Sequence, residues 1–451
     1  MNLDETIVAI ATPPGRGGLG VVRLAGAEAK PIALAMLRLS ADRSLEANRA
    51  TLAQLLDRAS GERIDEVMAT YFAAPHSYTT DDIVEIACHG SPVVLQRAVE
   101  MALQLGARMA EPGEFTARAF LNGRLDLPQA EAVRDLVDAQ TLYQAKVAAR
   151  QLKGELSGVV HPVKEHLLEL IAGLEAGIDF AEDDVAIMPA ELVLKAIAEV
   201  DGKLKPLEAS FAFGKLVHQG LTLAIVGRPN VGKSSLFNRL VERERAIVTA
   251  QPGTTRDLVT ETVALGGIPV RLVDTAGMRE ALDEAESIGI RKSMEVLADA
   301  DLVLVVLDAS AELSDADREL LADVAGRAAI VVGNKSDLGT GFEWRGELPM
   351  VRTSALTGEG TAELRESILR VASGSLASDG GALITNLRQQ QQVQAARAAL
   401  QAASASAAKA IPHEMVLLDL YAALHALDEL TGATTADDIL NRIFSTFCIG
   451  K

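Results

Sequence analysis

The chain has 451 residues, a formal net charge of −19 and only two cysteines, Cys88 and Cys448. The length predicts about three domains of ~150 residues each. No apolar run approaches the ~18 residues that cross a bilayer, and two distant cysteines favour a reducing, cytoplasmic setting. The acidic charge argues against a general attraction to nucleic acid, so RNA would have to be held by a local patch or by a partner protein.

The first part of the chain, residues 1–120, has an α+β pattern. Strands are expected at 6–11, 20–24, 67–72 and 83–87, and one clear helix at 92–105, with a proline in its first turn. Residues 15–20 match G-x-G-x-x-G, but a strand-like run follows them, so we do not expect a dinucleotide site. Cys88-His89 has no second Cys or His nearby in sequence, so a zinc site is not expected either.

Two blocks, residues 121–214 and 374–451, are rich in Ala, Leu, Glu, Gln and Lys at three- and four-residue spacing. This spacing predicts long amphipathic helices, at 127–213, 387–408 and 413–430. Neither block could bury its apolar stripe alone. We therefore expect the two blocks to pack together, with the central domain, residues 215–373, inserted between them.

The central domain alternates strands and helices, which is typical of a parallel sheet with helices on both faces. Continuous apolar runs at 221–226, 270–273, 302–307 and 329–332 are expected as strands buried on both faces. Residues 227–234 read Gly-Arg-Pro-Asn-Val-Gly-Lys-Ser and match the phosphate-binding loop in full. Lys233 should reach the terminal phosphates, and the Ser234 hydroxyl should coordinate Mg²⁺.

Three further segments predict that the nucleotide carries guanine. Asp274-Thr275-Ala276-Gly277 supplies a carboxylate for the water shell of magnesium and an N–H for the γ-phosphate, and Thr255 is the expected second magnesium ligand. In Asn334-Lys335-Ser336-Asp337, the aspartate can accept both N1–H and N2–H₂ of guanine. Ser354-Ala355 is the last of the segments expected to contact the guanine nucleotide. The expected nucleotide contacts are Gly227, Asn230, Val231, Gly232, Lys233, Ser234, Ser235, Thr249, Ala250, Gln251, Pro252, Gly253, Thr254, Thr255, Asp274, Thr275, Ala276, Gly277, Asn334, Lys335, Asp337, Ser354 and Ala355.

The hydrolytic residues are less evident. Many GTPases place a water-orienting glutamine directly after Asp-x-x-Gly, but Met278 stands there. A replacement could come from the acidic residues of segment 279–286, and the pattern alone does not choose among them. Asn230 could hold a monovalent cation beside the phosphates or simply brace the loop. The acidic candidates are Glu280, Asp283, Glu284 and Glu286.

Over essentially its whole length the chain resembles the MnmE (TrmE) family of tRNA-modification GTPases. Besides the GTPase segments, the likeness rests on the motifs at residues 11–18, 112–116, 119–122 and 447–451. It implies a multi-domain α/β protein: an α+β folate-binding and dimerisation domain (1–120), an all-α helical domain from both flanks (121–214 and 374–451) and an inserted P-loop GTPase domain (215–373).

The resemblance also implies roles for individual residues. Hydrolysis would be stimulated by K⁺, with catalytic roles for Glu286 as the water-orienting carboxylate, Lys233 and Asn230. The K⁺ shell would comprise Asn230, Thr249, Gln251 and Thr254. The positions that contact folate align with Arg23, Glu85, Arg124 and Lys451, of which 124 is usually lysine in the family. Cys448 would be either a catalytic thiol or a contact residue in the folate pocket.

The family further implies a homodimer and an FAD-dependent partner, MnmG (GidA), in a heterotetramer that engages tRNA. Together they would add a carboxymethylaminomethyl or aminomethyl group to C5 of the wobble uridine. The one-carbon unit would come from a tetrahydrofolate derivative in its 5-formyl or methylene form. The alternative is a ribosome-assembly GTPase switch, although such proteins usually carry a basic RNA-binding module that this acidic chain does not show.

Overall fold

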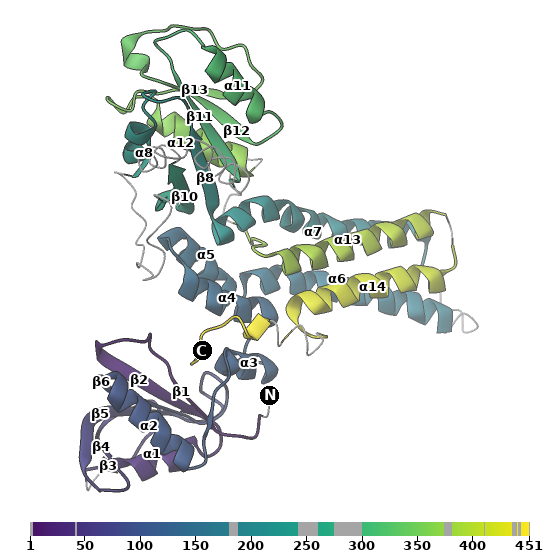
Figure 1. Ribbon diagram of the computed structural model, residues 1–451. Helices are drawn as coiled ribbons and strands as arrows, with labels where there is room; N and C mark the ends of the chain where they lie inside the picture. The colour runs from purple at the N-terminus through teal and green to yellow at the C-terminus, as the bar shows by residue number, and fades with distance from the viewer. Residues whose placement is uncertain are drawn as a thin grey trace. The chain divides into compact units, whose positions relative to one another are not determined.

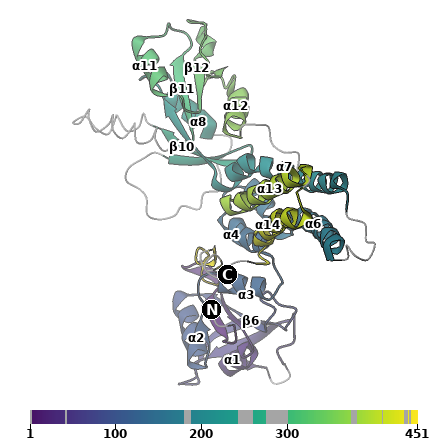
Figure 2. The same cartoon turned by 90° about the vertical axis from the view of Figure 1, so that its right-hand side faces the viewer.

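The computed structural model describes residues 3–40, 43–179, 188–241, 260–274, 300–373, 381–409, 411–434, 440 and 443–450, without the side chains at 179, 260 and 274. The chain divides into two compact units. Unit 1 combines residues 1–134, 152–157 and 428–451, and unit 2 combines residues 135–151 and 158–427. Both units are drawn in Figure 1 and, turned by 90°, in Figure 2.

Unit 1 contains a mostly antiparallel sheet with the strand order β3-β4-β5-β6-β2-β1-β7, in which only β7 runs parallel to its neighbour β1 among the described pairs. Helices α1 and α2 bury one face of it, where Ile32, Met36 and Leu95 pack against Leu24 and Val84. The elements are β1 Ile7–Ile10, β2 Gly17–Ala25, α1 Ala29–Met36, β3 Leu37–Leu39, β4 Ala50–Leu56, β5 Arg63–Phe72, β6 Ile83–Gly90, α2 Pro92–Gln104 and β7 Arg108–Met109.

The helix expected at 92–105 is confirmed as α2, but α1 and α3 (Glu114–Leu121) are two further helices that the sequence did not reveal. Both are short, and neither carries a side-chain N-cap: the N-cap position of α1 is Glu28, and that of α3 is Gly113 with a left-handed backbone. Helices of eight residues are held by tertiary packing rather than by local preference. The strand β2 also begins at Gly17, before the expected start at residue 20, as a continuation of its pairing with β6.

The end of the chain is part of unit 1. Phe444 and Phe447 pack with Ala117 and with Ala130 of helix α4 (Leu127–Asp138). The two phenylalanine rings lie 5.5 Å apart between centroids. Burial of large aromatic side chains dominates the stability of such small cores, so the segment 443–450 is fixed onto the N-terminal region of the fold.

The helices of unit 2 form a bundle in which α7 lies beside α13 and α14 beside α6 (Figures 1 and 2). Arg397 of α13 joins two carboxylates of α7, with Nε donating to Asp201 over 2.7 Å and Nη1 donating to Glu208. The expectation that the two flanking helical blocks pack together is therefore confirmed. The helices are α5 Leu142–Leu152, α6 Glu155–Asp179, α7 Ala190–Gln219, α13 Leu387–Ala408 and α14 His413–Thr431.

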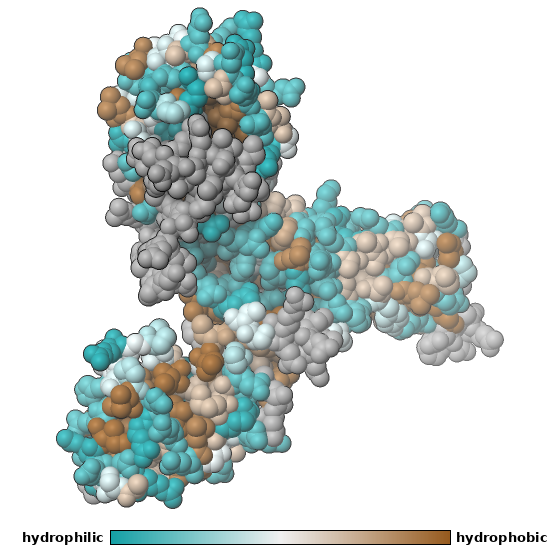
Figure 3. All heavy atoms as spheres, in the orientation of Figure 1, coloured by the Kyte–Doolittle hydropathy of each residue, from teal (hydrophilic) through white to brown (hydrophobic). Residues whose placement is uncertain are grey.

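The surface of this bundle is mixed in character. Apolar side chains gather over its end where α14 begins (Figure 3), and Leu192, Met415 and Leu418 are exposed there. A cavity of about 550 Å³ opens at the same end and is lined by residues of α6, α7, α13 and α14. Among the described helices none is long and apolar enough to span a membrane.

The α/β part of unit 2, residues 221–373, holds the second sheet, with strand order β13-β12-β11-β8-β10-β9. Helices α8 and α12 pack on one face and α11 on the other. The four expected strands, β8, β10, β11 and β12, run parallel as predicted, and the additional edge strand β9 runs antiparallel to β10. The elements are β8 Leu221–Val226, α8 Lys233–Val241, β9 Thr260–Leu265, β10 Ile268–Asp274, β11 Leu302–Asp308, α11 Asp315–Asp323, β12 Ala329–Asn334, β13 Met350–Arg352 and α12 Thr361–Ser373.

Candidate guanine-nucleotide site

The loop 227–232 connects the carboxyl end of β8 to the first turn of α8, as the sequence predicted. Its backbone leaves the ordinary regions at Gly227 (φ 156°), Asn230 (φ 65°) and Gly232 (φ 96°). A Cβ at Gly227 would lie 2.4 Å from the carbonyl oxygen of Val306 on β11. Glycine is therefore required at 227 by the close approach of two backbones, and at 232 by the left-handed conformation as well.

Lys233, the first residue of α8, is buried at 8% exposure. Its Nζ donates to the carbonyl oxygens of Gly227 and Arg228 over 2.9 and 2.8 Å. The ammonium group thus lies within the curve of the loop, at a helix N-terminus that favours anions. Ser234 and Ser235 follow in the first turn and are exposed. This arrangement suits a polyphosphate.

Asn334 ends strand β12 and connects three segments of the site. Its Nδ2 donates to Val231 O in the phosphate loop over 2.9 Å, and its Oδ1 accepts the N–H of Ala355 over 3.0 Å. The residue is 1% exposed, and a Cβ at Gly232 would meet its Nδ2 at 2.2 Å. The sequence placed Asn334 and Ala355 at the base. The structure bonds Asn334 directly to the phosphate loop and joins Ala355 to that loop through Asn334.

Lys335 and Asp337 directly follow strand β12, at the carboxyl edge of the sheet where β11 also ends. Lys335 has a left-handed backbone (φ 65°), and its Nζ pairs with Asp308 Oδ2 over 2.6 Å at the end of β11. Burial pushes the pKa of the Asp308 carboxyl upward, but hydrogen bonds from Lys335 and Ser310 outweigh it and leave the pKa below its ordinary value. Asp337 is exposed on a short 3₁₀ turn, Ser336–Leu338, so its carboxylate is open to a base.

One ion pair of this site was missed from the sequence. Arg228 Nε donates to Asp317 Oδ1 of α11 over 2.7 Å, and Asp317 also accepts from the hydroxyl and the backbone N–H of Ser314 as part of a capping box. The capping-box pattern S-x-x-D is visible at 314–317. Nothing in that pattern indicated that the same carboxylate would hold the second residue of the phosphate loop.

Several expected site residues lie outside the described residues. Strand β10 ends at Asp274, whose backbone pairs with Ile225 beside the phosphate loop. This position agrees with a role at the carboxyl edge of the sheet. The other expected residues that fall outside are Thr249, Ala250, Gln251, Pro252, Gly253, Thr254, Thr255, Thr275, Ala276, Gly277, Glu286 and, in unit 1, Lys451.

Unit 1 brings together three of the four expected folate contacts. Arg23 of β2 pairs across the sheet with Glu85 of β6, with Nε donating to Oε1 over 2.9 Å. Arg124 donates to the carbonyl of Ser77. Between the two arginines lies Tyr78, which the sequence analysis did not single out.

The environment of Tyr78 shows how these groups converge. Burial raises the pKa of its hydroxyl, whereas a hydrogen bond with Thr116 (3.0 Å) and the charges of Arg23 and Arg124 act in the opposite direction. The guanidinium carbon of Arg23 lies 6.0 Å from the centre of the Tyr78 ring and 5.5 Å from that of Phe115. Two cations, one carboxylate and two aromatic rings thus surround one region of unit 1.

Comparisons with known proteins show the family of the chain. The family described as MnmE helical domain matches residues 127–448, and the family described as GTP-binding protein TrmE N-terminus matches residues 6–124. The tRNA modification GTPase MnmE of Koribacter versatilis is 66% identical over 454 residues, which cover 100% of both chains. The chain belongs to the MnmE family.

Less similar members of the MnmE family also align with this chain over nearly its whole length. The tRNA modification GTPase MnmE of Symbiobacterium thermophilum is 45% identical and spans 99% of this chain and 100% of its own length. That of Aquifex aeolicus is also 45% identical, over 100% of both chains. The resemblance to the MnmE family predicted from the sequence is therefore confirmed, together with the fold class.

The two thiols of this MnmE-family chain differ sharply. Cys88 is fully buried on β6, and burial, with a smaller contribution from Asp65, raises the pKa of its thiol to about 12. Cys448 is exposed, in the tail that packs on unit 1, and its carbonyl accepts the N–H of Gly113 over 3.4 Å. Of the two, only Cys448 has a thiol accessible to a reactant.

Proposed function

We propose that this chain binds and hydrolyses GTP at the phosphate loop and uses the cycle in the modification of tRNA. The observation that carries the proposal is the buried side chain of Asn334. It bonds to Val231 in the phosphate loop and to Ala355, which belongs to the segment expected beside the guanine base. Phosphate and base subsites are thereby held in one fixed frame. Asp337 would accept the N1–H and N2–H₂ of guanine, and Lys233 would turn from the loop carbonyls to the terminal phosphates.

Two ions belong to this proposal. Mg²⁺ would be held by Ser234 and Thr255, and K⁺ by Asn230, Thr249, Gln251 and Thr254, so that both neutralise charge that develops on the phosphates during hydrolysis. Asn230 is exposed, and within the described ranges its side chain makes no hydrogen bond. A bracing role for Asn230 thus has no partner among those residues, and the cation-binding role is favoured. Glu286 would orient the attacking water.

Unit 1 fits a tetrahydrofolate derivative by its chemistry. A pterin ring is flat and presents several N–H donors, and its glutamate tail is anionic. The half-buried ring of Tyr78 offers a flat apolar surface, Glu85 offers an acceptor, and Arg23 and Arg124 offer cations. When bound, the 5-formyl or methylene form would supply the one-carbon unit, and Cys448 would be a contact residue of the same pocket.

The proposed assembly has four parts: residues 1–120 for folate binding and dimerisation, 121–214 and 374–451 for the helical domain, and 215–373 for the GTPase domain. The outer face of the sheet in unit 1 supports a homodimer, because Leu19, Leu52 and Met68 are exposed there on β2, β4 and β5. With the FAD-dependent MnmG (GidA) this dimer would form a cytoplasmic heterotetramer that places a carboxymethylaminomethyl or aminomethyl group on C5 of the wobble uridine.

The first test compares GTP hydrolysis by the purified chain in KCl and in NaCl at equal ionic strength. Potassium should stimulate wild type strongly, and Asn230→Ala should lose that stimulation while still binding GDP. Asn238→Ala, an exposed asparagine on α8, is the matched control. Equal rates in the two salts would leave a GTPase but remove the role of Asn230.

The second test reads tRNA from a deletion strain by mass spectrometry of its nucleosides. Loss of the modified wobble uridine, restored by wild type but not by Lys233→Ala, is the expected result. Unchanged tRNA together with accumulated ribosomal subunits would instead favour the assembly-switch alternative. The match of the TrmE N-terminus family to residues 6–124 favours tRNA modification, because an assembly switch has no need of that unit.

A further inference from the structure

One arginine connects helix α8 to the loop beside the expected guanine subsite. Arg239 lies in the last turn of α8, the helix that begins at Lys233 of the phosphate loop. Its Nε donates to the carbonyl oxygen of Ala355 over 3.1 Å, and its Nη2 donates to that of Leu356 over 2.6 Å. Both bonds are charge-assisted, which makes them stronger than neutral ones.

The loop that accepts these bonds is closely organised. Ser354 is fully buried, its N–H donates to Glu359 O over 3.0 Å, and its own carbonyl accepts the N–H of Gly358 over 2.8 Å. The guanidinium carbon of Arg239 lies against Gly358, where an added Cβ would sit 3.8 Å away. The arginine therefore rests on the loop as well as bonding to it.

Ala355 is held from two directions by two different elements. Its N–H donates to Asn334 Oδ1 of β12, and its carbonyl accepts from Arg239 of α8. Asn334 in turn donates to Val231 O in the phosphate loop, which continues directly into α8. The contacts close a ring that runs from the phosphate loop through Asn334 and Ala355 to Arg239 and back along α8.

We propose that Arg239 is a positioning residue that sets the base-side loop 354–356 at a fixed distance from the phosphate loop, and so determines affinity for guanine nucleotides. This rests on the proposed binding of GTP at the same site. Without Arg239, Ala355 keeps only its bond to Asn334, and the carbonyls of Ala355 and Leu356 must find water. The loop then samples positions that fit the base less well, which weakens binding through lost preorganisation.

A purely structural role of Arg239 has a different signature. A cation in the last turn of a helix stabilises the helix dipole, so its removal would lower the melting temperature and loosen the whole site. The positioning role predicts a loss restricted to ligands that carry the base. Inorganic pyrophosphate is a probe that fills only the phosphate subsite.

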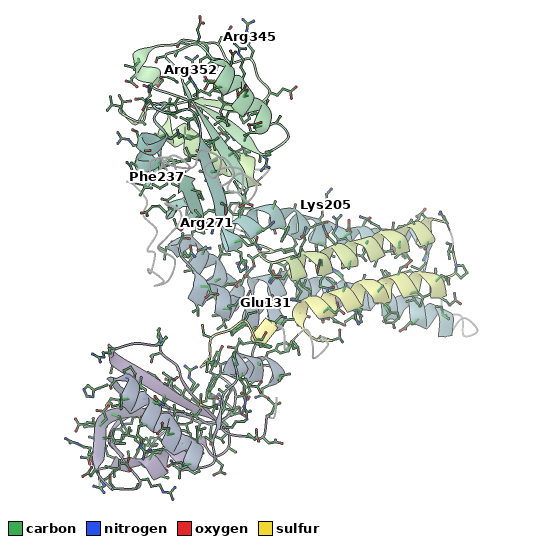
Figure 4. The ribbon with its side chains drawn as sticks, viewed as in Figure 1. Glu131, Lys205, Phe237, Arg271, Arg345 and Arg352 are labelled. Carbon is green, nitrogen blue, oxygen red and sulfur yellow. The ribbon has the colours of Figure 1, made fainter. Side chains whose placement is uncertain are left out.

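The experiment uses the full-length chain as wild type, Arg239→Gln, Arg239→Lys and the control Arg345→Gln. Arg345 is an exposed arginine of the same α/β part that pairs with Glu343 and lies well away from Phe237 of α8 (Figure 4). For each protein we would measure the Kd of GDP by fluorescence, competition by inorganic pyrophosphate, kcat and KM for GTP, and the ligand-free melting temperature.

For Arg239→Gln we expect Kd for GDP and KM for GTP to rise about tenfold, with unchanged pyrophosphate competition and kcat within about twofold of wild type. Arg239→Lys keeps the positive charge but not the planar guanidinium. Its Kd for GDP and its KM for GTP should lie between those of wild type and Arg239→Gln. Arg345→Gln should match wild type in every measurement.

Equal GDP affinity in wild type and folded Arg239→Gln overturns the inference, and so does an equal loss for GDP and pyrophosphate. If Arg239→Gln does not fold, Arg239→Lys decides the case, because wild-type GDP affinity in that variant would contradict the need for the two bonds. If wild type itself fails to bind GDP, the proposed function fails instead, so the two failures are distinguishable.

Discussion

The guanidinium of Arg23 donates to the carbonyl oxygen of Gly450 over 3.2 Å, although 427 residues separate the two in sequence. The same guanidinium pairs with Glu85 on the neighbouring strand. The tail thereby borders the group of cations and aromatic rings that we propose as the folate site. It also brings Cys448 to this unit, which explains why a thiol near the end of the chain belongs with residues near its beginning.

Gly450→Ala should disturb this junction. The backbone at Gly450 has φ 96°, and an added Cβ would lie 2.5 Å from the carbonyl oxygen of Ile10, so the tail would have to move. We expect 5-formyltetrahydrofolate, measured by titration calorimetry, to bind about tenfold less tightly, with GTP hydrolysis unchanged. Gly106→Ala is the matched control, because φ is 102° there but no atom lies within 4 Å of the added Cβ. If Gly450→Ala and Gly106→Ala bound folate with equal affinity, the C-terminal tail would not contribute to the folate site.

Asn334→Ala should impair nucleotide binding severely. The substitution removes a buried side chain and leaves the carbonyl of Val231 and the N–H of Ala355 without their partner, at about 1–3 kcal/mol for each buried group. We expect GDP affinity to fall by at least about a hundredfold, read by fluorescence titration. Asn238→Ala on the exposed side of α8 should be neutral. If Asn334→Ala changed GDP affinity by less than about threefold, the two hydrogen bonds of Asn334 would not be what holds the phosphate loop and Ala355 together.

The sequence predicted the strand and helix around the phosphate loop better than it predicted the helices of unit 1, for a physical reason. Strands buried on both faces, such as β8, read as continuous apolar runs, and the phosphate loop needs glycine at positions that a motif records. By contrast, α1 and α3 have no side-chain cap, and tertiary packing makes them helical. Contacts between distant segments, such as Arg228 with Asp317 or Arg23 with Gly450, leave no periodic trace and needed the structure.

The ion pair between Arg228 and Asp317 should be measurable by a double-mutant cycle. The Asp317 side chain is only 2% exposed, so Asp317→Asn should lower the free energy of unfolding by about 1–3 kcal/mol, and Arg228→Gln should add little to it. Asn keeps an acceptor for the capping box, so the coupling reports on the charge pair. If the losses of unfolding free energy in Asp317→Asn and Arg228→Gln simply added in the double variant, a direct interaction between the two side chains would be contradicted.

The same pair has a defined pH dependence. Burial pushes the pKa of Asp317 upward, but hydrogen bonds from Arg228 and Ser314 outweigh it, and the pKa is lowered in the folded chain. A lowered carboxyl pKa contributes stability that is fully present above the unfolded pKa of ~3.9 and is lost as pH falls through the folded value. The stability difference between wild type and Asp317→Asn should therefore be constant from pH 5 to 8 and narrow only below about pH 4, as measured by urea denaturation.

The two cysteines should react at very different rates. A disulfide reagent at pH 8 should label Cys448 at once and Cys88 only after denaturation, because the Cys88 thiol is buried and its pKa is about 12. Cys448→Ser should then show no rapid labelling in the native state. Because a raised thiol pKa disfavours ionisation in the folded state, stability should begin to fall only above the unfolded pKa, about pH 8.5. Rapid labelling of two thiols in native wild type would contradict the burial of Cys88.

Within unit 2, the turn of the β9–β10 hairpin rests on the segment before helix α5. The Thr141 hydroxyl donates to the carbonyl of Gly267 over 2.5 Å, and a Cβ added at Gly267 (φ 85°) would lie 2.5 Å from the Cβ of Tyr143. This hairpin lies in sequence between residues 242–259 and 275–299, which contain the expected Thr255 and Glu286. The hairpin turn is therefore in direct contact with the start of α5.

Gly267→Ala tests this joint. It should cost about 1–2 kcal/mol of stability for the left-handed backbone and more for the clash with Tyr143, whereas Gly326→Ala, with φ 81° and no atom within 4 Å, should show the backbone cost alone. Tyr143→Gly removes the clashing Cβ, so the double variant Gly267→Ala/Tyr143→Gly should lose less stability than the sum of the two single variants. Thermal denaturation of the four proteins gives the coupling energy. A coupling energy near zero would contradict a direct steric contact between the hairpin turn and α5.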